Sequence, residues 1–161
     1  MGINDRLQDL AIKHQIDLQH YGNGVVKRML AILNESDPAL FAELSAQLEK
    51  MTSASFNVKK LDKLLSSVSA LNAAAYASIL IALEKELQDF VDYEANYQQQ
   101  AITKILPPQI TIAHISAEQA YTAAHARPFQ GKLLKEWIEG LETDKAIRIR
   151  DTICTMVSLL T

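Results

Sequence analysis

Apolar residues recur at steps of three and four along most of the chain, which is the spacing of one face of an α-helix. The first stripe extends from Ile3 to Ile32 and predicts an amphipathic helix of about thirty residues. Its middle carries Tyr21-Gly22-Asn23-Gly24, and each glycine costs about 1 kcal/mol relative to alanine inside a helix. The glycines therefore predict a kink, a close approach of another backbone, or a break between two shorter helices.

Two further helices are expected in the middle of the chain. Ser36-Asp37-Pro38 predicts a new helix start, because an aspartate can cap a helix and a proline suits its first turn. A short helix follows. After the polar loop at 52–55, Asn57 can cap a helix that reaches Leu71. At Asn72 this helix either turns or continues.

The longest uninterrupted pattern extends from Ala73 to Ile105 and contains neither proline nor glycine. Its apolar seam alternates steps of four and three over about four repeats, as in a coiled coil. Such a helix would be roughly 50 Å long, and elongated helices usually serve assembly. The seam comprises Tyr76, Leu80, Leu83, Leu87, Phe90, Glu94, Tyr97 and Ala101.

The chain after this helix begins with a stop signal. Leu106-Pro107-Pro108 ends the helix, and the alternation of isoleucine with polar residues over 109–115 predicts a short extended arm. Ser116 followed by Gln119 has the pattern of a capping box, which predicts the start of the next helix.

A corner between two helices is predicted around Pro128, which disfavours the α conformation at Arg127. Gly131 supplies a permissive backbone before a new helix with Trp137 on its apolar face. Phe129 is placed to pack beneath that helix. The sequence thus predicts a helix-turn-helix corner clamped by two aromatic side chains.

Thr143 or Asp144 can then cap a last helix. These patterns predict an all-α fold: an elongated helical bundle with one long central helix, a C-terminal helix-turn-helix corner and one short extended arm. Residues 1–105 would form an elongated N-terminal helical region. Residues 106–161 would add the arm and the C-terminal helices to the same structural unit.

Composition restricts the class of protein. The 161 residues suit one domain, and a hydrophobic content of 48% with a net charge of −3 indicates neither a disordered chain nor a general binder of polyanions. Cys154 is the only cysteine and lies in an apolar run, which predicts a buried, reduced thiol. The N-terminus lacks the pattern of a signal peptide. No apolar run approaches about 18 residues, so no membrane span is expected.

Candidate chemistry is sparse. The spacing of the four histidines fits no common zinc motif, and we expect no metal site, no cofactor, no catalytic residue and no enzymatic activity. His14 lies on the first apolar stripe, where a histidine usually satisfies a hydrogen bond at a helix interface. Asp17, one turn later, could orient it.

Charge gathers in two places. The acidic run comprises Glu84, Glu86, Asp89, Asp92 and Glu94. A solvated face accounts for most of it, but Glu94 falls on the apolar seam between Tyr93 and Tyr97, where it could fix register or meet a cation of a partner helix. The segment 127–150 is mildly basic and could pair with the acidic run, within one chain or between neighbours, or contact DNA.

The corner has one specific resemblance. The stretch Arg127-Pro128-Phe129-Gln130-Gly131-Lys132, continuing to Trp137, resembles the head morphogenesis proteins, also called minor head or minor capsid proteins, of tailed bacteriophages. Further similar stretches are His14-Gln15, Tyr21 to Val26, Leu71-Asn72-Ala73, Tyr93-Glu94, Gly140-Leu141-Glu142 and Arg148-Ile149-Arg150-Asp151.

The resemblance implies a non-enzymatic structural virion protein that docks at the portal vertex or the inner capsid during head assembly. It implies a portal or capsid protein as partner, a homo-oligomer or ring, and a location in the virion after synthesis in the host cytoplasm. The alternative is an internal head protein that contacts packaged DNA and is ejected with it.

Members of this family usually continue past the Arg-x-Arg-Asp element, so the chain resembles a short or truncated version of the N-terminal helical region. We assign the candidate partner interface to the corner, its basic residues and the polar part of the seam. These candidates are Arg127, Pro128, Phe129, Lys132, Trp137, Arg148, Arg150, Glu94 and Tyr97.

Overall fold

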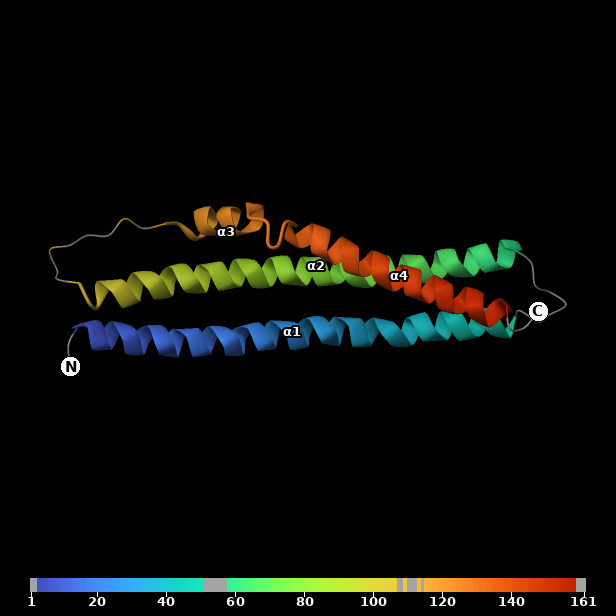
Figure 1. Ribbon diagram of the computed structural model, residues 1–161, viewed down its shortest axis with the longest axis horizontal. Coiled ribbons are helices and arrows are strands. Elements are labelled where there is room, and N and C mark those ends of the chain that lie inside the picture. Colours follow the sequence, from blue (N-terminus) through green and yellow to red (C-terminus); the bar gives the residue numbers. More distant parts are fainter. Residues whose placement is uncertain (1–2, 51–57, 107–108, 110–112, 114, 159–161) are drawn as a thin grey trace. The chain divides into compact units, whose positions relative to one another are not determined.

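The computed structural model describes residues 3–50, 58–106, 109, 113 and 115–158. Its helices follow the chain as α1 (Ile3–Glu49), α2 (Val58–Thr103), α3 (Ala117–Ala126) and α4 (Leu134–Ser158) (Figure 1). Within these residues the β-type pairing is a single bridge, between Phe129 and Lys132. The predicted all-α bundle with a long central helix is confirmed.

Helix α1 is longer than the sequence predicted. It is continuous through the Gly22 and Gly24 region, and Pro38 lies inside it rather than at the start of a new helix. The predicted restart is therefore wrong. The Ser36 hydroxyl donates to the carbonyl of Leu33 at 2.8 Å, as it does within a helix rather than at a cap. Just beyond the proline, Leu40 is 6% exposed, and its burial favours continuation of the helix despite the proline.

Helix α2 passes straight through Asn72, so the alternative of a turn there is wrong. The predicted seam is confirmed, because each of its eight residues is buried or half-buried. Beyond Thr103 the helix ends in one further turn, in which the N–H of Leu106 donates to the carbonyl of Ile102 at 3.1 Å. The predicted Asn57 cap, the polar loop and most of the extended arm lie outside the described residues.

The stretch of α2 from Leu64 to Leu83 carries no charged side chain. An 18-residue window of α2 has a mean hydropathy of 1.6, so this helix is long and apolar enough to cross a membrane by length and composition. The expectation that no apolar run approaches 18 residues is therefore wrong by mean hydropathy. Alanine and uncharged polar residues lie within the run but do not lower its mean hydropathy below that of a membrane span. Core helices of soluble proteins share the property, and the absence of a membrane span stays a prediction.

The C-terminal helices confirm one predicted boundary and correct another. The Ser116 hydroxyl accepts from the N–H of Gln119 at 3.2 Å, which confirms the capping box. Helix α4 is continuous past Thr143, so the predicted cap at Thr143 or Asp144 is wrong. The Thr143 hydroxyl instead donates back to the carbonyl of Glu139 at 2.8 Å, within the helix. Cys154 is exposed on α4 rather than buried.

The chain forms two compact units, each of which takes a part of both long helices. The first unit comprises residues 1–28 and 82–133, and the second unit comprises residues 29–81 and 134–161. In the second unit, α1, α2 and α4 share an apolar core of Leu40, Leu64, Val68 and Ile153. In the first unit the buried side chains include Val91 and, unusually, a histidine.

Candidate functional site

The histidine of the first unit is His14, which is 7% exposed. Its Nε2–H group on α1 donates to Oε2 of Glu94 on α2 at 2.7 Å. Its ring lies parallel to the ring of Tyr97, with 3.8 Å between the centroids and 7° between the planes. Nδ1 has no hydrogen-bond partner among the described residues, so the predicted orienting role of Asp17 is wrong. The group that Glu94 meets is therefore a histidine of the same chain.

A second polar cluster lies two turns away along the same pair of helices. The Tyr21 hydroxyl donates to Oε2 of Glu86 at 2.9 Å, and Nη2 of Arg28 donates to the same oxygen at 2.7 Å. Nε of Arg28 donates to Oε1, so the guanidinium and the carboxylate pair through two bonds. Burial, together with the hydrogen bond to Glu86, raises the pKa of Tyr21 to about 12. The hydrogen bonds from Arg28 lower the pKa of Glu86.

These contacts change the interpretation of the acidic run. Asp89 and Asp92 are exposed, as a solvated face requires. Glu86 and Glu94 instead bind side chains of α1, and Glu84 lies 3.7 Å from Nε2 of His125 on α3. Three acids of the run therefore join α2 to α1 and α3 in the first unit. Within the described residues, no group of three or more His, Cys, Asp and Glu side chains could hold a metal ion.

The predicted corner is a tight turn. The N–H of Phe129 donates to the carbonyl of Lys132 at 2.9 Å, and the N–H of Lys132 donates back at 3.1 Å. Between them Gln130 and Gly131 have φ values of 49° and 81°, the signs of a type I′ hairpin turn. Glycine adopts this backbone freely, whereas glutamine rarely does. Arg127 is extended, with φ −90° and ψ 116°, as expected before Pro128.

Phe129 is 69% exposed, so its predicted packing beneath the next helix is wrong. Trp137 is half-buried on α4, and Ile138 beside it is 7% exposed. Two backbone hydrogen bonds between Phe129 and Lys132 hold the corner. A two-residue turn with glycine at its second position is a sequence signal that could have predicted it.

The remaining interface candidates have different environments. Tyr97 stacks on His14, and its hydroxyl donates to the carbonyl of Leu10 at 3.4 Å, so it is engaged within the chain, as Glu94 is. Arg148 and Arg150 are exposed on α4, and Arg150 donates to Asp151 at 3.1 Å. Of these candidates, the arginines of α4 are the ones that face solvent.

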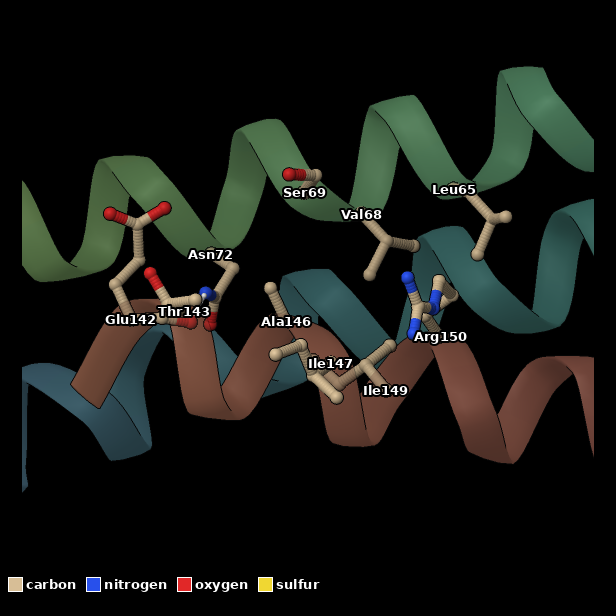
Figure 2. A pocket seen from close by; sticks show the side chains of 10 residues that line it. All are labelled: Leu65, Val68, Ser69, Asn72, Glu142, Thr143, Ala146, Ile147, Ile149 and Arg150. Atoms are coloured by element: carbon tan, nitrogen blue, oxygen red, sulfur yellow. Dashed lines mark hydrogen bonds between the residues drawn. The ribbon is translucent and has the colours of Figure 1, made fainter. Parts of the chain in front are cut away.

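Asn72 makes a contact between helices that the sequence did not predict. It lies in a groove of about 330 Å³ between α2 and α4, and Figure 2 shows its amide directed toward α4 near Glu142 and Thr143. Its Nδ2 donates to the carbonyl of Glu142 at 3.1 Å, while its Oδ1 has no partner among the described residues. The residue is 1% exposed, and its hydrogen bond joins α2 to α4 in the second unit. The sequence signal for this contact was a single amide side chain within the uncharged stretch from Leu64 to Leu83.

The outer face of α1 in the first unit carries exposed aliphatic side chains. Ile12, Ile16 and Val26 are 54%, 49% and 57% exposed, and their spacing places them on one side of the helix. Gly22 lies near this face, and nothing lies within 4 Å of the position that a Cβ would occupy there. No contact with a described residue therefore requires a glycine at this position.

No family model, curated protein or solved structure matches this chain.

Proposed function

We propose that this chain is a structural virion protein of a tailed bacteriophage, a minor head or head morphogenesis protein that docks at the portal vertex or inner capsid during head assembly. The resemblance of the stretch from Arg127 to Trp137 to that family suggests the role. The exposed turn at Phe129 and the outer face of α1 offer surfaces for docking.

The observation that carries this proposal is the exposed Phe129. Phe129 is 69% exposed and is the first residue of a hydrogen-bonded turn, so its backbone is already ordered before a partner binds. Aromatic residues with a basic neighbour are typical of the energetic centres of protein interfaces. Arg127 lies two residues before Phe129 and Lys132 three residues after it. The turn therefore fits an acidic surface with an apolar recess.

The outer face of α1 offers a second surface of the same kind. A row of half-exposed Ile12, Ile16 and Val26 is apolar area that an assembly would cover. An uncrowded Gly22 beside the row would let a neighbouring backbone approach closely. This surface suits repeated contact with neighbouring copies, as in a ring.

Co-sedimentation of the purified chain with portal rings of the same virus, over a salt series and with DNA as competitor, tests the role. We expect binding that survives high salt, because an apolar anchor is screened little by ions. Phe129→Ala should weaken the binding, whereas Tyr93→Ala, which removes a 52% exposed aromatic side chain from α2, should not.

The same experiment decides the alternative. DNA binding that disappears as salt rises, with no binding to portal rings, would replace the assembly role by that of an internal head protein. The pairing of Arg150 with Asp151 and of Lys135 with Glu139 reduces the positive charge that α4 could offer to phosphates. This is why we place docking to a protein first.

A further inference from the structure

A groove of about 380 Å³ lies between α1 and α4 in the second unit. Its lining includes Leu40 and Ile153, which are 6% and 3% exposed and belong to the apolar core. Phe41 also lines the groove and is 63% exposed. An exposed aromatic side chain beside buried aliphatic ones makes a surface that is suited to an apolar ligand group.

The charged residues of this groove do not cancel. Nζ of Lys145 lies 3.1 Å from Oδ1 of Asp37, so these two neutralise each other. Arg148, almost one turn further along α4, also lines the groove and is exposed. Its guanidinium has no partner among the residues that the structure describes. The groove therefore combines an apolar surface with one uncompensated positive charge.

We propose that this groove binds an amphipathic helix of a partner protein. An apolar side chain of that helix would cover Leu40 and Ile153 beside Phe41, and an acidic side chain would pair with Arg148. A helix lying in a groove between two helices is a common mode of peptide recognition. The bidentate geometry of a guanidinium favours a carboxylate as its partner.

Charge complementarity selects this occupant over a second copy of the chain. A symmetric dimer through the same groove would bring two Arg148 side chains toward each other, which is unfavourable without an acid between them. A fully apolar ligand would leave Arg148 without a partner. The groove and the Phe129 turn belong to different units, so a chain that fails to bind portal rings can still bind a partner helix here.

Fluorescence anisotropy with the full chain and two synthetic peptides tests the groove. Both peptides are amphipathic helices of about four turns with leucine and phenylalanine on one face. One carries glutamate beside the apolar face, and the other carries lysine at the same positions. We expect the acidic peptide to bind about tenfold more tightly than the basic one.

Two variants test whether the peptide binds in this groove. Phe41→Ala should lower the affinity for the acidic peptide about tenfold. Arg148→Glu should make the basic peptide bind more tightly than the acidic one. The matched controls are Ile81→Ala, which removes a similarly exposed apolar side chain of α2, and Arg150→Glu, which changes an arginine that lines the groove at Asn72. Both controls should stay within about twofold of the unchanged chain.

Helical content measured by circular dichroism distinguishes lost binding from lost folding in each variant. Equal binding of the two peptides would overturn the proposal, and so would an unchanged preference in a folded Arg148→Glu variant. A concentration-dependent dimer that Phe41→Ala abolishes would assign the groove to a second copy and would also overturn it.

Discussion

The Nε2–H group of His14 donates to Oε2 of Glu94 across 2.7 Å and joins α1 to α2 in the first unit. A buried polar pair of this kind contributes modestly when complete, but losing one member leaves the other without a partner. It also favours one register of the two helices, because a shift by one position of the seam would place the histidine against Phe90 or Tyr97 instead of a carboxylate.

Glu94→Ala should therefore lower the free energy of unfolding by about 1–3 kcal/mol, since it removes the hydrogen-bond partner of buried His14. Urea denaturation measures the change. Asp92→Ala is the matched control, because Asp92 is an exposed acid on the same helix and should change stability by less than about 0.5 kcal/mol. Equal effects of the two substitutions would mean that the pair does not stabilise the fold.

Tyr21 should ionise near pH 12, because burial and the hydrogen bond to Glu86 raise its pKa to about 12. The difference in phenolate absorbance between the unchanged chain and Tyr21→Phe isolates its titration. Glu86→Gln should move the midpoint toward the ordinary value of about 10, whereas Asp92→Asn should leave it in place. Because the pKa is raised, the contribution of Tyr21 to stability is complete below about pH 10 and is lost as the pH rises toward 12.

Low pH should reduce the free energy of unfolding by protonating Glu86. The hydrogen bonds from Arg28 lower the pKa of this carboxyl in the folded state, so its contribution is present above the unfolded value of about 4.3 and is lost as the pH falls through the folded pKa. Urea denaturation at a series of acidic pH values should show a steeper loss for the unchanged chain than for Glu86→Gln. Parallel curves would show that the pair with Arg28 does not contribute.

Pro38→Ala tests the continuity of α1. A proline inside a helix is about 3 kcal/mol less favourable than alanine, so the substitution should raise the free energy of unfolding by up to about that amount. Pro128→Ala, which changes a proline outside any helix, is the control and should give no such gain. If Pro38→Ala also leaves the free energy of unfolding unchanged, a helix start at Pro38 would explain the result, because proline is favourable in the first turn of a helix.

The same substitution at two glycines should have opposite effects. Gly131→Ala should lower the free energy of unfolding by about 1–2 kcal/mol, because its φ of 81° is unfavourable for a residue with a side chain. Gly22→Ala should raise it by about 0.5–1 kcal/mol, because the added methyl group meets nothing within 4 Å on a helix. Thermal unfolding of the two variants measures both changes in stability. A more stable Gly131→Ala variant would contradict the positive φ at Gly131.

Much of the helical framework could be predicted from local pattern. The seam of α2 was predicted because its three- and four-residue steps repeat without an interruption, and the Ser116 capping box because its two partners are three residues apart. The wrong boundaries at Pro38 and Thr143 share one cause. Both rest on residues that favour helix starts, and such preferences are smaller than the gain from burying residues further along the same helix, such as Leu40 and Ile153.

The contacts of the candidate sites were less predictable. The sequence showed that Glu94 was out of place on an apolar seam, but not that its partner was His14, eighty positions away. It likewise gave no sign that Arg28 and Tyr21 would share Glu86. Partners so far apart in the sequence are chosen by the register of two helices, which no local pattern contains.

By itself, then, the sequence determined that the chain is helical, which face of each helix is apolar and where α3 begins, because these depend on residues within one or two turns of each other. The tertiary structure alone decided that α1 and α4 continue past their predicted breaks, that Phe129 and Cys154 are exposed, and that a groove lined by an exposed Arg148 lies between α1 and α4. Those outcomes depend on which surfaces meet, and burial across the helices outweighs the weaker local preferences.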